Sequence, residues 1–222
     1  MTTLDFGPAT TALATLVRGV GDDQLDGPTP NTGRSVGDLL DHIGGLALAF
    51  TAAARKEEPP GGGNPTADAS ALPDDWRVAI PDRLAALAES WRDPAAYEGS
   101  TQAGPVEMPA DAAALVALDE VTIHAWDLAV ATGQQYDADP AAVDACAGFV
   151  ATFDAPRDGG LFGPEVAVPD SASAFHRLLG ATGRDPHWSP TQQPAQLAGL
   201  HVVCVWQEFP AHASPLSHVA QS

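Results

Sequence analysis

The segment Glu120-Val-Thr-Ile-His124-Ala-Trp-Asp127 decides how the fold of this chain is interpreted. Glu120 and His124 are four residues apart, which places them on one face of an α-helix with their Cβ atoms roughly 5–6 Å apart. Apolar residues fill most other positions from Val116 to Val130, so this helix should be buried on nearly every side. A buried carboxylate and imidazole need partners, and a metal ion is one such partner. The same spacing is also common in ordinary helical Glu–His hydrogen bonds.

Helical periodicity extends on both sides of this segment. Ser35 is a good N-cap for a helix that carries a clear apolar stripe, and Gly133 ends the central helix. Pro81 lies inside another periodic stretch, so that helix either begins at Pro81 or is kinked there. The predicted helices begin after Pro8 and then span about Ser35 to Arg55, Trp76 to Trp91, Ala110 to Ala131, Pro140 to Phe153 and Ser171 to Ala181.

The connections show no convincing strand pattern. The stretch from Glu57 to Ser70 contains Pro59-Pro60-Gly61-Gly62-Gly63 and is predicted to be a loop, and Gly160 to Pro169 is at most an extended segment. Four long amphipathic helices therefore predict an all-α fold, an up-down four-helix bundle with a small C-terminal helical and extended addition. A length of 222 residues fits one such domain with extensions.

Charge and composition narrow the class of protein. The formal net charge is -19, with 10 basic against 29 acidic residues, which disfavours binding to nucleic acids and to anionic membranes. The chain has no apolar run of 18 residues and no signal-peptide pattern at its N-terminus, so we expect a cytoplasmic protein. Cys146 and Cys204 are too few for a disulfide framework, and Cys146 lies in an apolar stretch typical of a buried residue.

His42 supplies a third candidate metal ligand. It lies at the edge of the apolar stripe of the helix that begins after Ser35. Taken alone, a structural histidine with satisfied hydrogen bonds is the simpler interpretation. Together with Glu120 and His124, however, it offers two imidazole nitrogens and a carboxylate oxygen, the set that a catalytic zinc takes when it keeps a fourth position for water or substrate. Nickel, iron and manganese also suit this chemistry.

Three motifs carry a resemblance to a known family: Asp38-Leu-Leu-Asp-His42, Glu120 to Gly133, and Gly183-Arg-Asp-Pro-His-Trp188. In these motifs the chain resembles the mycothiol-dependent maleylpyruvate isomerase N-terminal domains, a family of DinB/YfiT-like metal-binding four-helix bundles. The resemblance covers roughly Leu4 to Trp188. It implies one unit at residues 1–188. Beyond Trp188 the resemblance stops, and residues 189–222 are predicted to be a partly ordered tail rather than a second metal site, because His201, His212 and His218 are widely spaced. Leu200 to Trp206 could form a short strand or docking segment there.

The resemblance also implies a site and a chemistry. It implies that His42, Glu120 and His124 hold a divalent metal, with zinc favoured, and that Asp127 either orients an imidazole or is a solvated or capping residue. The implied function is a metal-dependent transferase or isomerase that uses a low-molecular-weight thiol of the mycothiol type as cosubstrate. The alternative is a non-catalytic metal- or ligand-binding bundle. The substrate is not predicted, a homodimer is an open expectation, and the candidate carboxylate-binding cations are Arg34, Arg177 and Arg184.

Overall fold

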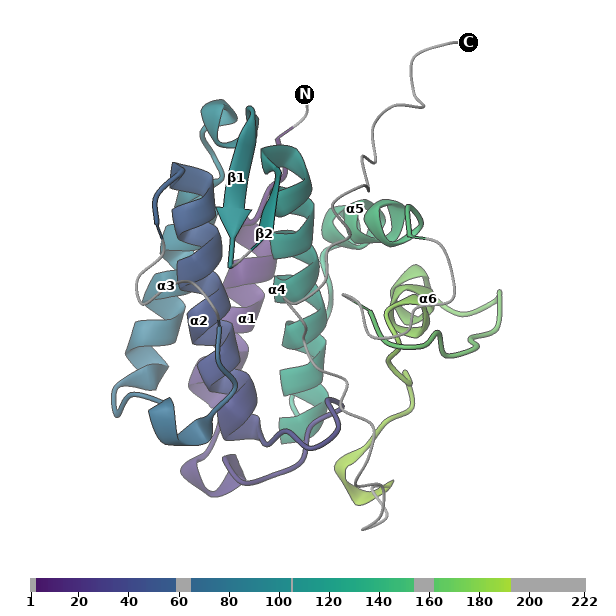
Figure 1. The fold of residues 1–222 in the computed structure, drawn as a ribbon. Helices are drawn as coiled ribbons and strands as arrows, with labels where there is room; N and C mark the ends of the chain where they lie inside the picture. Colours follow the sequence, from purple (N-terminus) through teal and green to yellow (C-terminus); the bar gives the residue numbers. More distant parts are fainter. Residues whose placement is uncertain (1–2, 59–64, 105, 154–161, 193–222) are drawn as a thin grey trace.

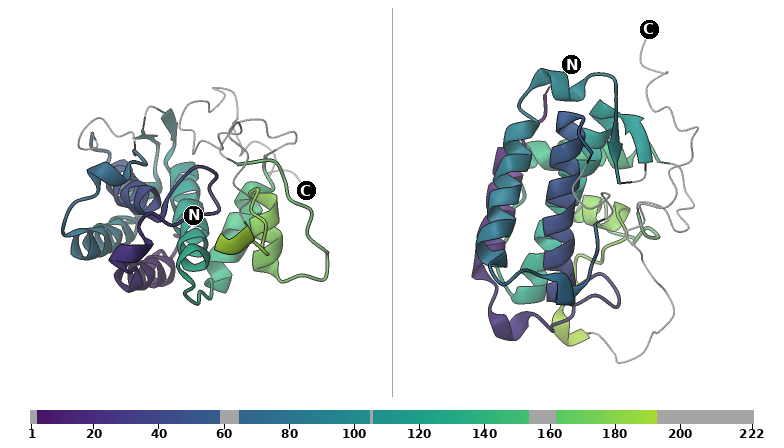
Figure 2. Two further views of the ribbon diagram at one scale, coloured as in Figure 1. Left: turned by 90° about the horizontal axis from the view of Figure 1, so that it is seen from below. Right: turned by 60° about the vertical axis from the view of Figure 1, so that its left-hand side comes forward.

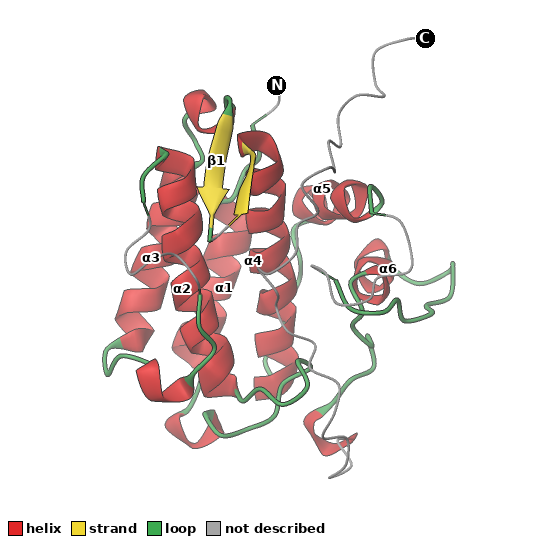
Figure 3. Ribbon diagram, viewed as in Figure 1, coloured by secondary structure: helices red, strands yellow, loops and turns green. Residues whose placement is uncertain are grey.

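The computed structural model describes residues 3–58, 65–104, 106–153 and 162–192, and Figure 1 shows their arrangement. Four long helices lie side by side, a fifth, shorter helix packs against the fourth, and a sixth packs against the fifth. Figure 3 separates helices from strands by colour. The helices are α1 (Gly7–Gly19), α2 (Val36–Arg55), α3 (Trp76–Ser90), α4 (Ala110–Thr132), α5 (Pro140–Val150) and α6 (Ala174–Ala181), and the strands are β1 (Ser100–Ala103) and β2 (Val106–Pro109).

Local sequence accounts for most helix boundaries. Ser35 Oγ accepts a hydrogen bond from the backbone N–H of Asp38, and the Asp38 carboxylate accepts one from the N–H of Ser35, which together form a capping box at the start of α2. Gly133 ends α4 in the left-handed conformation, with φ of 70°. α3 begins at Trp76 and continues through Pro81, so the alternative start at Pro81 is wrong. The predicted four-helix bundle is confirmed.

The order of the helices around the bundle brings α2 next to α4. α1 and α2 each pack against both α3 and α4, so α1 lies opposite α2, as the end-on view in Figure 2 shows. Contacts at the helix ends give their directions. Arg77 at the start of α3 donates to the carbonyl of Val20 after α1, whereas Arg55 and Ser90, at the ends of α2 and α3, are hydrogen-bonded. α2 and α3 therefore run in the same direction, because a long connection returns between them, and this corrects the up-down order that was predicted for the bundle.

That return connection passes along α2. The backbone N–H of Ala69 donates to Asp38, and the side chain of Thr66 donates to Asp41, so two carboxylates of α2 hold the segment from residue 65 to 71. Gly45 permits the approach, because a Cβ there would lie 3.2 Å from Pro65. This close contact brings the backbone of the loop to the middle of α2.

The hairpin of β1 and β2 corrects the expectation that the chain has no strands. The two strands pair in antiparallel register, with Ser100 opposite Pro109 and Thr101 opposite Met108. Each strand has only four residues, which is too short for a clear alternating pattern. Thr101 donates to the carbonyl of Ala53 at 2.6 Å, and this bond ties the hairpin to the end of α2.

The C-terminal addition packs on the outer side of α4. α5 contacts α4, and α6 contacts α5. α5 ends at Val150 and α6 begins at Ala174, so both are slightly shorter than predicted. Residues 162–169 have no regular structure, whereas residues 160–161 and the predicted segment Leu200 to Trp206 lie outside the described residues. Residues 190–192 form a single 3-10 turn.

α2 is the one described helix that is long and apolar enough to cross a membrane. In the structure, 72% of its most apolar window is buried inside the protein. Its apolar character is therefore explained by its place in the core of the bundle, where Leu40, Ile43 and Leu46 have no exposed surface.

Candidate metal centre

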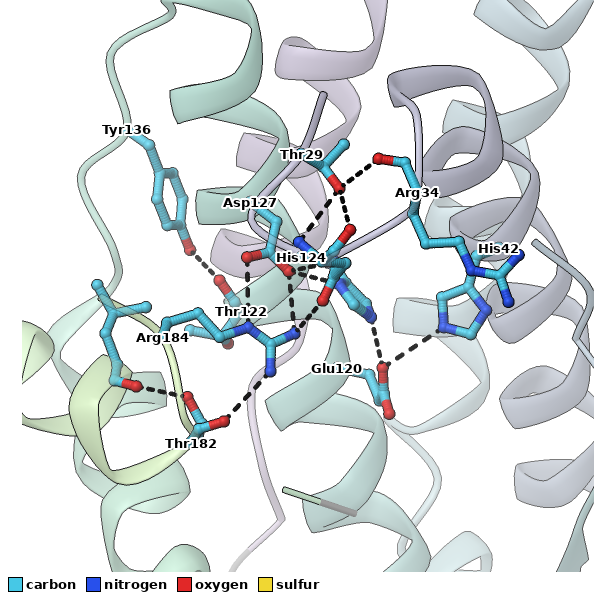
Figure 4. Close-up of polar contacts among 12 residues, drawn as sticks. Thr29, Arg34, His42, Glu120, Thr122, His124, Asp127, Tyr136, Thr182 and Arg184 are labelled. Carbon is cyan, nitrogen blue, oxygen red and sulfur yellow. Dashed lines mark hydrogen bonds and ion pairs between the residues drawn. The ribbon is translucent and has the colours of Figure 1, made fainter. Parts of the chain in front are cut away.

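The three predicted ligands meet between α2 and α4. His42 comes from α2, and Glu120 and His124 come from successive turns of α4, as Figure 4 shows. His42 is 4% exposed and His124 is 2% exposed. Their ligand atoms, with a carboxylate oxygen of Glu120, all lie within 4.8 Å of one another. Tertiary packing thus brings His42 to the Glu120/His124 pair, which is what the sequence predicted for this residue.

Both imidazoles direct Nε2 toward the same carboxylate oxygen. Glu120 Oε2 lies 2.8 Å from His124 Nε2 and 3.8 Å from His42 Nε2. The two rings are 5.1 Å apart between centroids and nearly perpendicular, at 88°. A tetrahedral zinc site with bonds of about 2.0–2.2 Å separates its ligand atoms by roughly 3.3 Å. The observed separations bracket that value, so the donor set fits a divalent ion without a large rearrangement.

His124 is oriented by a buried carboxylate on its own helix. Its Nδ1 lies 2.9 Å from Oδ2 of Asp127, which has no exposed surface. Because a carboxylate only accepts hydrogen bonds, Nδ1 donates its proton to Asp127, and Nε2 is the nitrogen that faces Glu120 and is available to a metal ion. Of the two interpretations of Asp127, orientation of the imidazole is the one that the geometry supports.

His42 is oriented by backbone instead. Its Nδ1 lies 3.3 Å from the carbonyl oxygen of Thr66, in the return connection along α2. A carbonyl oxygen also only accepts hydrogen bonds, so Nδ1 of His42 carries the proton, and Nε2 faces the Glu120 carboxylate. Thr66 and its support by Asp41 were missed at the sequence level, since a carbonyl contact leaves no residue-type signal.

Glu120 is held in its ionised form by the two histidines. Burial raises the pKa of this carboxyl, but hydrogen bonds and charge interactions with His124 and His42 outweigh it and hold the pKa well below its ordinary value. An ionised carboxylate with two neighbouring imidazole nitrogens is a ligand set that suits zinc, iron, nickel or manganese.

Three polar side chains contact the carboxylate of Asp127. Oδ2 accepts hydrogen bonds from Asn31 Nδ2 at 3.0 Å and from Arg184 Nη2 at 3.1 Å, in addition to His124. Burial raises the pKa of Asp127, but the Arg184 charge and the His124 hydrogen bond lower it to about 2. Asn31 was not singled out from the sequence, because its Pro30-Asn31-Thr32-Gly33 context is typical of a turn.

The three candidate arginines have separate positions. Only Arg184 reaches the groups around the centre. Arg34 is exposed and donates to the carbonyl of Ala67, and Arg177 is exposed on α6 and donates to carbonyls of Asp170 and Ala172. The structure therefore brings one of the three to the site and gives the other two local contacts with loop backbone.

Another buried carboxyl of α4, that of Asp119, lies toward Cys146 of α5. Asp119 is 5% exposed, and its Oδ1 has no hydrogen-bond partner among the described residues. Burial and the neighbouring Glu120 raise the pKa of Asp119 to about 8. Burial also raises the pKa of the nearby Cys146 thiol, and Cys146 is fully buried, which confirms its predicted structural role.

The four-helix bundle with two imidazoles and a carboxylate between adjacent helices is the arrangement that the resemblance to DinB-like bundles implied. The model of the family described as mycothiol maleylpyruvate isomerase N-terminal domain matches residues 6–129, more than half of the chain. The chain belongs to this family. The match begins just before α1 and ends within α4, so it contains all three members of the cluster.

The chain is also similar to two curated proteins and to two solved structures. Two uncharacterized proteins from two strains of Mycobacterium tuberculosis are 34% identical over 130 residues, which covers 58% of this chain and 66% of each relative. The match thus spans just under two thirds of their length. A crystal structure of the mycothiol-dependent maleylpyruvate isomerase has a TM-score of 0.50 and 20% identity, and covers 64% of this chain and 65% of that chain. A mutant of that enzyme gives a TM-score of 0.50 and 19% identity. These structures share the fold.

Proposed function

We propose that this chain is a divalent-metal protein in which His42, Glu120 and His124 hold the ion, with zinc favoured. The observation that carries the proposal is the convergence of His42 Nε2, His124 Nε2 and Glu120 Oε2 in a buried position between α2 and α4. Acceptors at both Nδ1 atoms support it, because they set each ring to present Nε2. Three protein ligands leave a zinc ion with a further coordination position.

The chemistry we propose is that of a transferase or isomerase that uses a low-molecular-weight thiol of the mycothiol type. When bound, the metal supplies positive charge that lowers the pKa of a thiol and favours the nucleophilic thiolate. The protein contributes a carboxylate that stays ionised at Glu120 and two imidazoles whose Nδ1 protons are held by Asp127 and Thr66. Family membership and the name of the structurally similar isomerase support the thiol as cosubstrate.

The metal site is tested by comparing the metal content of the wild-type protein with that of variants at the three ligands and at one control histidine. We expect purified wild-type protein to contain close to one equivalent of divalent metal by mass spectrometry. His42→Ala, Glu120→Ala and His124→Ala should each lose it, whereas His187→Ala, which changes an exposed histidine beyond α6, should keep it. If all three centre variants retain metal like the wild type, the assignment of these ligands is wrong.

The thiol chemistry needs a separate measurement. Wild-type protein and His124→Ala are assayed for consumption of a thiol with an electrophilic double-bond substrate, before and after treatment with a chelator. We expect thiol-dependent turnover that is lost on chelation and absent in His124→Ala. Bound metal without turnover for any thiol would instead favour the non-catalytic binding protein.

The cellular location and the partners of the chain are part of the same proposal. A thiol cosubstrate fits a cytoplasmic location, where thiols stay reduced. The net charge of -19 still argues against nucleic-acid partners. The homodimer and the division into residues 1–188 and 189–222 stay predictions.

A further inference from the structure

Arg184 lies outside the four-helix bundle in sequence, yet its guanidinium group ends beside the candidate metal centre. It follows α6 in the C-terminal addition, and its side chain is only 10% exposed. We propose that Arg184 is a positioning residue of the metal centre, which acts through Asp127 to hold the His124 imidazole in place. The proposal rests on the metal-binding function proposed above.

The contacts of the guanidinium group define the orientation of the carboxylate. Arg184 Nε lies 3.4 Å from Oδ1 of Asp127, and Nη2 lies 3.1 Å from Oδ2. A two-point contact of this kind fixes the plane of a carboxylate as well as its position. Oδ2 of the same carboxylate lies 2.9 Å from Nδ1 of His124, and Figure 4 marks this contact with a dashed line.

Asn31, in the loop before α2, forms hydrogen bonds with both Arg184 and Asp127. Its Oδ1 accepts a hydrogen bond from Arg184 Nη2 at 2.9 Å, and its Nδ2 donates to Asp127 Oδ2 at 3.0 Å. Guanidinium, amide and carboxylate therefore form a closed triangle of hydrogen bonds. Loss of the guanidinium would leave the Asn31 oxygen with one fewer donor and the Asp127 carboxylate with two fewer, and both residues are buried.

The conformation of the backbone before Arg184 directs this side chain toward the metal centre. Gly183 has φ of 87°, and a Cβ at this position would lie 2.9 Å from the Cα of Gly163, so only glycine fits. The N–H of Arg184 donates to the carbonyl of Leu179 at 2.8 Å, and Nη1 donates to the carbonyl of Thr182. The C-terminal addition thus completes the surroundings of His124.

The first test measures zinc affinity by competition with a chromophoric chelator, normalised to the folded fraction from circular dichroism. We expect Arg184→Gln to weaken zinc binding by about 10- to 100-fold, the usual effect of losing an outer-shell partner. Arg184→Lys keeps the charge but not the planar fork, so its affinity should lie between those of Arg184→Gln and the wild type. The matched control is Arg177→Gln, which removes an exposed arginine from the same addition and should leave affinity unchanged.

The second test asks whether Arg184 acts through Asp127. In a double-mutant cycle, Arg184→Gln should weaken zinc binding by less than about twofold when Asp127→Asn is already present. Equal losses in the two backgrounds would overturn the proposed route. A purely structural role would lower the folded fraction and leave the affinity of the folded protein unchanged.

The outcomes separate this inference from the proposed function. If wild-type protein does not bind zinc or another divalent ion, the proposed function fails. If the wild type binds zinc and Arg184→Gln binds it within about twofold while folded, only the role of Arg184 is overturned.

Discussion

The two histidines of the candidate centre are supported in different ways on the α2 side and the α4 side. On the α4 side, His124 contacts a fully buried carboxylate at 2.9 Å, and that carboxylate is itself held by Arg184 and Asn31. On the α2 side, His42 contacts the carbonyl of Thr66, an exposed loop residue, at 3.3 Å. One support is charged and buried, and the other is neutral and near solvent.

The difference shows that two histidine ligands of one centre need not be held in place equally firmly. A buried anion makes an imidazole more basic as well as oriented, whereas a backbone carbonyl mainly orients it. A charged network in the interior is also costly to break, because removal of one partner leaves the other uncompensated. We therefore expect substitutions on the α4 side to have larger effects than matched substitutions on the α2 side.

The largest effect on stability should come from Asp127→Asn. This change leaves the Arg184 guanidinium without its buried anion, and we expect the free energy of unfolding at pH 7 to fall by about 3 kcal/mol in the metal-free protein. Urea denaturation in the presence of a chelator measures it. A loss no larger than that of Asp41→Asn, the matched change on the α2 side, would remove the contrast between the two sides.

A smaller effect, of opposite sign, is expected for Asp119→Asn at the buried position of α4 that lies toward Cys146 of α5. The folded pKa of Asp119 is raised from 3.8 to about 8, so the folded carboxyl stays protonated where the unfolded one ionises. This group therefore costs stability as pH rises from about 4 to 8. Asparagine does not titrate, and we expect the variant to gain at least about 1 kcal/mol relative to wild type between pH 5 and pH 7.

Urea denaturation of Asp119→Asn and wild type at several pH values, with chelator present, provides the check. Parallel pH profiles for the two proteins would show that the Asp119 carboxyl is not buried as the structure has it. In that case, Asp119 could no longer be contrasted with Asp127 as a buried carboxyl that has fewer hydrogen-bond partners.

The smallest effect should come from Asp41→Asn. Asp41 accepts hydrogen bonds from the Thr66 hydroxyl and from the N–H of Asp68, both near solvent. We expect a loss of about 1 kcal/mol or less in unfolding free energy and a less than tenfold loss in zinc affinity, since the loop still covers α2. Isothermal titration with zinc measures the second quantity. A loss as large as that of Asp127→Asn would mean that the loop carbonyl matters as much as the buried carboxylate.

Much of the fold could be predicted from the sequence, because helix boundaries depend on nearby residues. The caps at Ser35 and Gly133 and the apolar periodicity gave the four long helices and their approximate ends. The hairpin of β1 and β2 could not be predicted, since strands of four residues are stabilised by their partner and by contact with α2. The order of the helices around the bundle could not be predicted either, because it depends on how the helix faces pack against one another.

The sequence by itself determined the part of the centre that lies on one helix. Glu120, His124 and Asp127 recur at helical spacing, so their common face follows from the 3.6-residue repeat. Only the tertiary structure decided that His42 meets Glu120 and His124, and which distant groups support the two imidazoles. Asn31 lies 96 residues from Asp127 in sequence, and Arg184 lies 153 residues from Asn31. Contacts at such separations depend on packing of whole elements, and no local periodicity encodes them.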